Sequence, residues 1–146
     1  MTLVAPGRAA REAAAEAFPD DGGKGFLAVE LGGAVVINTH VTYGARHAGQ
    51  LARVAAVASP WSGLVVVVGD FNADAATVSA ALGPSYTVAA PAPTARPTRP
   101  REAGGKASTI DHVVVRGGHA REVVVHDVAG VSDHNLVTAI VTIPET

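Results

Sequence analysis

The clearest pattern along the chain is a run of apolar residues that ends in a polar cluster, LVVVVGDFN over residues 64–72. The segment from Leu64 to Val68 is apolar and mostly β-branched, which favours a short strand buried on both faces over a helix. Gly69 permits a turn or the close approach of another group. Asp70 and Asn72 therefore emerge at the carboxyl end of a buried strand, where ligands bind in open α/β sheets.

The rest of the chain alternates between helical and strand patterns. An alanine-rich stretch that ends at Pro19 predicts a first helix. Apolar residues along one face of the segment before Pro60 predict a second helix. A cap at Asp74 and a stop at Gly83 predict a third. Alternating or continuous apolar runs predict the strands, with hairpins at Gly32-Gly33 and Gly117-Gly118. The expected helices span residues 8–18, 46–59 and 75–82, and the expected strands span residues 26–31, 34–41, 64–68, 86–89, 109–116, 122–126 and 136–143. Strands interleaved with helices predict a layered α/β (α+β) fold.

Length and composition fit a single domain with a moderate core. The chain has 146 residues, of which 48% are hydrophobic and 16% are charged, and this composition argues against disorder. A net charge of -2 provides no broad basic field for nonspecific binding of nucleic acid. The absence of cysteine excludes disulfides, thiolate zinc sites and thiol nucleophiles. The sequence shows no transmembrane segment and no secretory signal, so we expect a cytoplasmic protein.

Polar clusters lie at four places where apolar strands begin or end. They are Asn38-Thr39-His40, Gly69-Asp70-Phe71-Asn72, Ile110-Asp111-His112 and Ser132-Asp133-His134. Each cluster alone is more typical of a turn or a cap. Because strand ends at one edge of a sheet can converge, the four together predict a pocket with three carboxylates and two imidazoles. Carboxylate and amide oxygens suit a hard divalent cation such as Mg²⁺, and an imidazole can exchange a proton with a phosphoryl oxygen.

These clusters, read as NTHV, GDFN, STIDHVVV and SDHNLV in this order, resemble the endonuclease/exonuclease/phosphatase superfamily. That superfamily includes DNase I-like nucleases, abasic-site endonucleases, sphingomyelinases and inositol-polyphosphate phosphatases. Arg46 and Gln50 in the second predicted helix, and Pro97-Thr98 ahead of the third cluster, also resemble the family. The resemblance covers about residues 26–143 and implies a DNase I-like layered β-sandwich with flanking helices.

The resemblance implies a phosphoesterase that depends on a divalent metal, Mg²⁺ or Mn²⁺, and hydrolyses its substrate with activated water. His40 is similar to the histidine that contacts the scissile phosphate in the family. Asp70 is similar to the acid that orients or deprotonates the attacking water and is also an expected metal ligand. Asn72 resembles the partner of that acid, which holds the phosphate or the nucleophile.

The resemblance extends to two further acids and a second histidine. Asp111 is similar to the carboxylate that fixes the tautomer of a histidine, and His134 is similar to that histidine, close to the phosphate. We therefore expect the imidazole of His134 within hydrogen-bonding reach of the Asp111 carboxylate. Asp133 resembles a metal-binding acid and is, with Asp70, the second expected metal ligand. The phosphoester substrate itself is left open.

One part of the family pattern is missing from the sequence. Family members begin with a strand that carries an asparagine and a strand that carries a metal-binding glutamate, and no segment before Phe26 fits that description. Glu12 and Glu16 lie in the stretch predicted to be helical. We therefore expect residues 1–146 to form a truncated domain that lacks part of its first sheet and exposes strand edges. The alternatives are an inactive remnant, a binding module of the same fold, or a half-domain that needs a complementing N-terminal polypeptide.

Two features outside the predicted site stay ambiguous in the sequence. His112 adjoins Asp111 but is expected to point to the opposite face of the sheet, so a packing role is favoured. The long loop over residues 90–108 carries four prolines and the basic residues Arg96, Arg99, Arg101 and Lys106. This loop either contacts a phosphate-bearing substrate or is simply solvated.

Overall fold

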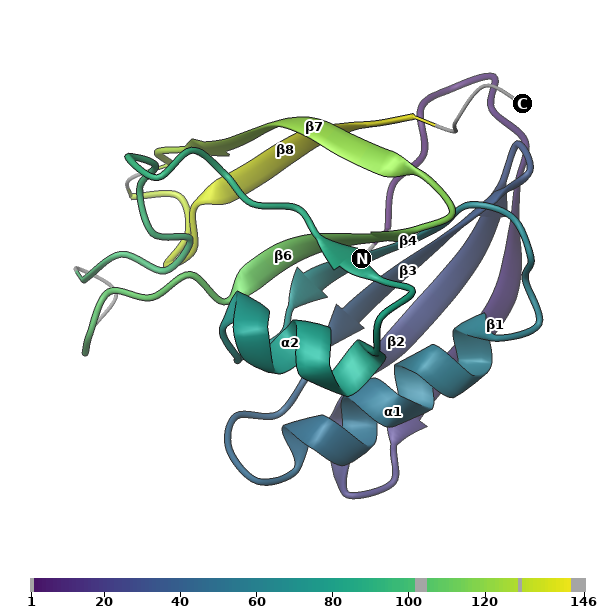
Figure 1. Cartoon of the computed structure of the whole chain (residues 1–146), viewed down its shortest axis with the longest axis horizontal. Coiled ribbons are helices and arrows are strands. Elements are labelled where there is room, and N and C mark those ends of the chain that lie inside the picture. The colour runs from purple at the N-terminus through teal and green to yellow at the C-terminus, as the bar shows by residue number, and fades with distance from the viewer. Residues whose placement is uncertain (1, 102–104, 129, 143–146) are drawn as a thin grey trace.

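The structure is a computed structural model that describes residues 2–101, 105–128 and 130–142 (Figure 1). The strands are β1 (Ala10–Phe18), β2 (Asp21–Leu31), β3 (Ala34–His40), β4 (Val65–Asp70), β5 (Thr87–Val88), β6 (Asp111–Arg116), β7 (His119–His126) and β8 (Leu136–Thr142). The helices are α1 (His47–Ala58), between β3 and β4, and α2 (Ala75–Leu82), between β4 and β5. Neither helix of the described chain is long and apolar enough to cross a bilayer.

The main sheet has six strands in the order β1-β2-β3-β4-β6-β5. The pairing is antiparallel except between β3 and β4, which run parallel and are joined by α1. The carboxyl ends of β3 and β4 therefore meet at one edge, where His40 lies opposite Asp70. Strand β6 starts at the same edge because it runs the other way, so that Asp111 also lies opposite Asp70.

Two apolar layers enclose the main sheet. Helices α1 and α2 cover one face, and a two-stranded sheet of β7 and β8 crosses the other (Figure 1). Successive valines of β4 serve both layers, since Val65 and Val67 belong to the helix-side core and Val66 belongs to the core beneath β7 and β8. The run at residues 64–68 is thus a strand buried on both faces, and the predicted layered α+β sandwich is confirmed.

Most predicted elements are present within a few residues of their expected bounds. Asp74 caps helix α2 as expected, since its side chain accepts a hydrogen bond of 2.8 Å from the backbone N–H of Thr77. This cap lowers the pKa of Asp74 because the bond favours the charged carboxylate. Strand β2 is longer than predicted and begins at Asp21, directly after the turn at Pro19 and Asp20.

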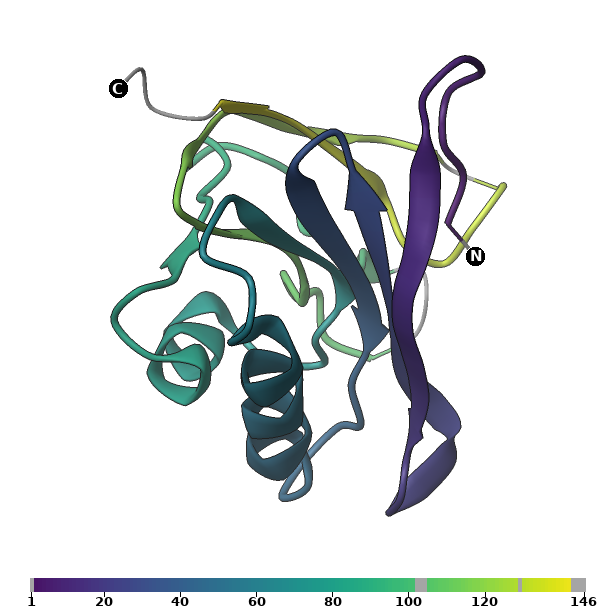
Figure 2. The same cartoon turned by 90° about the vertical axis from the view of Figure 1, so that its right-hand side faces the viewer.

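The predicted helix over residues 8–18 is wrong, because this stretch forms β1 at the edge of the main sheet (Figure 2). Helix propensity is a weak determinant even for alanine, which has the highest, and the open edge of β2 offers a ladder of hydrogen bonds. As a strand, the segment also buries Phe18 against Phe26, with ring centroids 6.1 Å apart. Glu16 is held by Arg53 of α1 at 2.7 Å, and this hydrogen bond lowers the pKa of Glu16.

The hairpin predicted at Gly117-Gly118 is also wrong. Strand β6 belongs to the main sheet, whereas β7 pairs with β8 in the second sheet. The two glycines instead lie where the chain crosses from the main sheet to the second sheet, and backbone atoms of other segments lie close to both. A Cβ at Gly117 would lie 2.9 Å from the carbonyl oxygen of Gly63, and one at Gly118 would lie 2.7 Å from the carbonyl oxygen of Thr142. A turn signal marks where the chain bends but not which strand it pairs with next.

His112 has the packing role that the sequence favoured. Its side chain lies on the helix side of β6, buried and edge-on to the ring of Phe71 at 5.6 Å. Its Nε2 lies 2.9 Å from the carbonyl oxygen of Ala73, so the neutral ring donates this hydrogen bond. Burial lowers the pKa of His112 below its usual value of 6.5, because the charged imidazolium loses its hydration.

Folding stability is therefore expected to fall as the pH is lowered below about 6.5. The unfolded chain takes up a proton at His112 there, whereas the folded chain resists it, so acid shifts the equilibrium towards unfolding. Denaturant unfolding followed by circular dichroism between pH 7.5 and 5 measures this slope. The variant His112→Gln, which keeps an N–H donor for the Ala73 carbonyl, should flatten it. An unchanged slope in that variant would show that other groups cause the acid sensitivity.

Candidate active site

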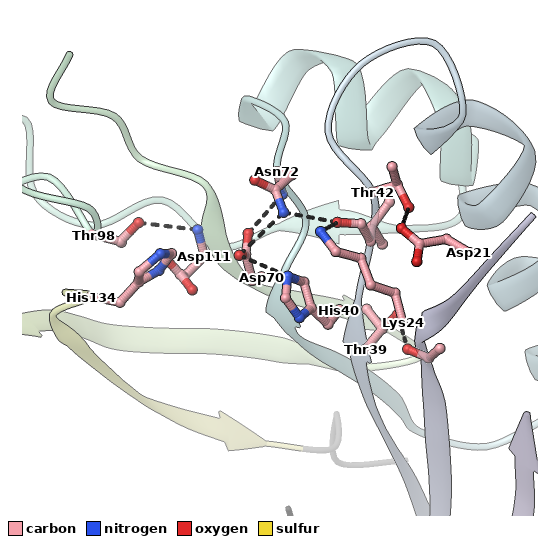
Figure 3. A network of polar contacts seen from close by, with 12 residues as sticks. Asp21, Lys24, Thr39, His40, Thr42, Asp70, Asn72, Thr98, Asp111 and His134 are labelled. Carbon is pink, nitrogen blue, oxygen red and sulfur yellow. Dashed lines mark hydrogen bonds and ion pairs between the residues drawn. The ribbon is translucent and has the colours of Figure 1, made fainter. Parts of the chain in front are cut away.

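The predicted site residues come together at the edge where β3 and β4 end and β6 begins. Figure 3 shows Asp70 between His40 on one side and Asp111 on the other, with His134 beyond Asp111. His134 comes from the segment before β8, so the second sheet brings it to the edge of the main sheet. The four sequence clusters thus meet in one place although they span residues 38–134.

Asp70 is the centre of a small network of hydrogen bonds. Its carboxylate accepts bonds from the backbone N–H of Asn72 at 2.8 Å and from the Asn72 side-chain amide at 3.2 Å. The Nε2 of His40 lies 3.3 Å from the same carboxylate. Asn72 reaches this position because its backbone adopts a left-handed conformation, φ 48°, which asparagine tolerates better than most residues. The GDFN turn therefore folds the amide back onto the acid.

Asp111 and His134 form the second pair of the site. The Nδ1 of His134 lies 2.8 Å from the Asp111 carboxylate, so the expected contact is present. A carboxylate only accepts hydrogen bonds, so Nδ1 carries the proton and Nε2 is left for another partner. The side chain of His134 is 23% exposed and that of Asp111 is 19% exposed, which leaves both within reach of a ligand.

Thr98 fixes the backbone on both sides of this pair. Its buried hydroxyl oxygen accepts bonds of 3.0 Å from the backbone N–H groups of Ile110 and Asp111. Its carbonyl oxygen accepts a bond of 2.6 Å from the backbone N–H of Asn135. Since these bonds lock the residues next to Asp111 and His134, Thr98 sets the geometry of the pair without lining the pocket itself.

Asp70, Asp111 and His134 are also the residues whose chemistry fits a metal ion. One ligand atom of each lies within 4.8 Å of the other two. Carboxylate oxygens are the preferred ligands of Mg²⁺ and Mn²⁺, and an imidazole is compatible with Mn²⁺. Asp133 is exposed and lines the same pocket, but it is not part of this compact group. Its role as a metal ligand stays a prediction.

The pocket above these residues is open and has a volume of about 910 Å³. Besides the predicted residues, its walls include Lys24 from β2, Tyr43 from the loop after β3, and Arg99 and Lys106 from the proline-rich loop. Lys24 and Tyr43 were missed in the sequence. A sequence signal existed for Tyr43, which comes two residues after the NTHV cluster. Lys24 had none, because only the pairing of its neighbour Gly25 with His40 in the sheet brings it to the pocket.

The helix residues Arg46 and Gln50 act from behind the pocket. Gln50 is buried, accepts a bond of 2.8 Å from the backbone N–H of Thr42 and donates one of 2.9 Å to Asp20. Arg46 donates a bond of 2.7 Å to the carbonyl oxygen of Asp20. Both residues therefore hold the loop that follows His40 rather than contacting a ligand.

A model of the Endonuclease/Exonuclease/phosphatase family matches residues 7–134. The chain therefore belongs to this family, as its sequence clusters predicted. The match starts well before Phe26 and includes β1, so the resemblance begins earlier in the chain than the expected residues 26–143. No curated protein matches the chain in sequence.

The fold is similar to those of several solved structures. Truncated TDP2 of Caenorhabditis elegans has a TM-score of 0.69 at 18% identity, over 94% of this chain and 67% of that one. TDP2 of D. rerio, complexed with a single-strand DNA product, has a TM-score of 0.62 at 14% identity, and the match covers 86% of this chain and 66% of that one. The inositol polyphosphate 5-phosphatase domain of SPsynaptojanin, in complex with inositol (1,4)-bisphosphate and calcium ion, has a TM-score of 0.61 at 14% identity. This match covers 93% of this chain and 56% of that one. The chain thus has a DNase I-like fold and spans between about half and two thirds of the length of these structures.

Proposed function

We propose that the protein is a divalent-metal-dependent phosphoesterase that hydrolyses its substrate with activated water. The observation that carries the proposal is the meeting of Asp70, Asp111 and His134 within 4.8 Å in an open pocket. The family to which the chain belongs supports the same class of reaction.

Each side chain has a role that its contacts support. A divalent cation held by Asp70 and Asp111, with Asp133 as a further expected ligand, would neutralise the anionic phosphate. His134, when protonated on both ring nitrogens, keeps its Nδ1 proton on Asp111 and can donate its Nε2 proton to a phosphoryl oxygen, which leaves the ring neutral. Asp70 orients the attacking water and, as a base, removes its proton.

His40 and Asn72 complete the arrangement on the other side of Asp70. The imidazole of His40 is half exposed in the pocket and contacts the scissile phosphate in this proposal. Asn72 donates to Asp70 and to the carbonyl oxygen of Val41 at 2.8 Å, so it keeps the Asp70 carboxylate in one orientation. Mg²⁺ or Mn²⁺ is the proposed ion, because two carboxylates dominate the donor set.

Metal binding and turnover test the proposal together. Titration calorimetry with Mn²⁺ should give a site whose affinity falls at least tenfold in Asp70→Asn, because one charged ligand is removed. Hydrolysis of bis(p-nitrophenyl) phosphate should require Mg²⁺ or Mn²⁺ and should fall by about 10²-fold or more in the same variant. The matched control is Asp74→Asn, which removes the same charge from an exposed helix cap that asparagine can also form.

The proposal fails if the folded wild-type chain binds no Mn²⁺, or if Asp70→Asn and Asp74→Asn behave alike. Turnover that continues in excess EDTA would also contradict it. Mn²⁺ binding without turnover would favour a binding module of the same fold.

A half-domain that needs a complementing polypeptide is the second candidate, and the second sheet favours it. Within the described residues this sheet has only the strands β7 and β8, and its outer face exposes Val124 by 45%, Leu136 by 54% and Ile140 by 41%. Apolar side chains gathered on one face are typical of a surface that another segment covers. Turnover that appears only when a separate N-terminal segment of a related domain is added, and that Ile140→Lys abolishes, would support this candidate.

A further inference from the structure

The aromatic side chain at the rim of the pocket differs from every other aromatic side chain in the protein. Tyr43 is 81% exposed, whereas the three phenylalanines and Tyr86 are at most 6% exposed and Trp61 is half-buried. With so few aromatic residues available for its core, the protein leaves one in water beside its metal-binding acids. An exposed ring at the rim of a pocket offers a π-face on which a flat ligand can stack.

The loop that carries Tyr43 is held by hydrogen bonds of the two residues that precede the ring. The backbone N–H of Val41 donates to the carbonyl oxygen of Asp70 at 2.8 Å, which ties the start of the loop to the site. The backbone N–H of Thr42 donates to Gln50 at 2.8 Å, and its hydroxyl donates to Asp21 at 2.8 Å. The bond from Thr42 lowers the pKa of Asp21, so that acid is charged and the contact is strong. The loop therefore presents Tyr43 at a fixed place relative to Asp70, and little entropy is lost when a ligand stacks on it.

Cations line the same pocket around its acidic centre. They are Lys24, Arg99 and Lys106, three of the 11 lysines and arginines of a chain whose net charge is -2. Lys24 donates to the carbonyl oxygen of Val41 at 3.2 Å, so its charge is anchored beside the loop of Tyr43. Arg99 is bridged to Ser108 by backbone bonds of 2.9 and 3.0 Å, which join the two arms of the proline-rich loop next to the pocket. These positive charges can bind phosphates on either side of the one that is cleaved.

From these observations we propose that Tyr43 is a stacking platform for a nucleobase next to the cleaved phosphate, and that Arg99 and Lys106 bind a neighbouring phosphate. The substrate class is then a single-stranded nucleic acid, which rests on the phosphoesterase function proposed above. Bases of a single strand are free to stack on a protein ring, whereas those of a duplex are already stacked. An inositol phosphate has no flat π-face for Tyr43 to bind, so the aromatic ring argues against that substrate.

Binding measured without turnover tests the platform directly. Fluorescence anisotropy in EDTA compares a fluorescein-labelled dT12 strand with a strand of the same length that contains abasic sites. We expect dT12 to bind more tightly, and Tyr43→Ala to weaken dT12 binding by about 5- to 150-fold while leaving the abasic strand almost unaffected. Tyr43→Phe should keep the wild-type affinity, because it keeps the ring. The exposed ring of Tyr43 contributes little to the core, so both variants should keep the fold, and the Tm of each variant checks this.

The phosphate contacts have their own readout and control. Lys106→Ala and Arg99→Ala should each weaken binding of both strands and reduce the salt dependence of the affinity by about one charge. Arg121→Ala is the matched control, because Arg121 is an exposed cation on β7 outside the pocket and should change neither quantity.

The outcomes separate this proposal from the one on which it rests. Equal binding of dT12 and the abasic strand, or of wild type and Tyr43→Ala, would overturn the platform even if the protein hydrolyses phosphoesters. Tighter competition by inositol bisphosphate or by duplex DNA than by unlabelled dT12 would also overturn it. A base preference that depends on Tyr43 in a chain without turnover would uphold the platform and reject the hydrolytic function.

Discussion

Replacing His134 with alanine is expected to lower the rate of metal-dependent phosphoester hydrolysis by about 10²- to 10⁴-fold. The variant removes the imidazole whose Nδ1 lies 2.8 Å from Asp111 and whose Nε2 faces the substrate in the proposed mechanism. It also leaves the Asp111 carboxylate without its hydrogen-bond partner. The measurement is kcat and KM on bis(p-nitrophenyl) phosphate with saturating Mg²⁺ or Mn²⁺.

His126→Ala provides the matched control for this substitution. His126 is an exposed histidine of β7, and its Nε2 lies 2.8 Å from the hydroxyl of Thr138, away from the pocket. Its loss should change kcat less than threefold. Adding Asp111→Asn to His134→Ala should slow the reaction further and weaken Mn²⁺ binding, because Asp111 is also a proposed ligand of the cation. Full activity of His134→Ala would contradict the role assigned to the histidine, and a double variant that binds Mn²⁺ as tightly as His134→Ala would contradict the role of Asp111 as a metal ligand.

Replacing Gly69 with alanine is expected to reduce the free energy of unfolding by about 2 to 6 kcal/mol. The backbone of Gly69 has φ +136°, which residues with a side chain rarely adopt. A Cβ at this position would lie 1.9 Å from the carbonyl oxygen of Thr39 in the neighbouring strand β3. The backbone can relieve this overlap only by separating β3 from β4 at the point where His40 and Asp70 meet. Denaturant unfolding followed by circular dichroism measures the loss.

Gly49→Ala is the control and should have the opposite sign. Gly49 lies in α1, and a Cβ added there would have open space within 4 Å, so alanine is expected to stabilise the helix by about 0.5 to 1 kcal/mol. The two substitutions add the same methyl group, so their difference isolates the backbone conformation and the close approach of Thr39. Equal effects at both positions would show that a Cβ at Gly69 does not clash with the backbone of Thr39.

The local patterns that identified the site are short and contiguous, which is why the sequence revealed them. The run from Leu64 to Val68 can be buried on both faces only as a central strand, so Asp70 had to emerge at its end. The clusters around His40, Asp111 and His134 also lie where an apolar strand begins or ends. The resemblance to the family then related clusters that lie far apart along the chain, and the family match confirms that the chain belongs to that family.

The two wrong predictions, a helix at residues 8–18 and a hairpin at Gly117-Gly118, concern strand pairings that no local sequence pattern determines. The alanine-rich stretch at residues 10–18 is helical by propensity, but it became β1 because the edge of β2 and the pocket for Phe18 were available. The glycines at 117 and 118 signal a bend, yet whether β7 returns along β6 or crosses to β8 depends on which apolar face needs covering. Both outcomes are set by partners that lie far away in the chain.

The amino-acid sequence by itself determined the family, the layered fold and the identity of the polar residues at the strand ends. These properties depend on hydrophobic periodicity and on residue types within a few positions of one another, which the chain carries directly. Only the tertiary structure decided that Asp111 lies beside Asp70, that Thr98 fastens the Asp111 and His134 pair, and that Tyr43 is exposed at the rim. Those relations join segments that are tens of residues apart, and strand order and sheet crossing bring them together.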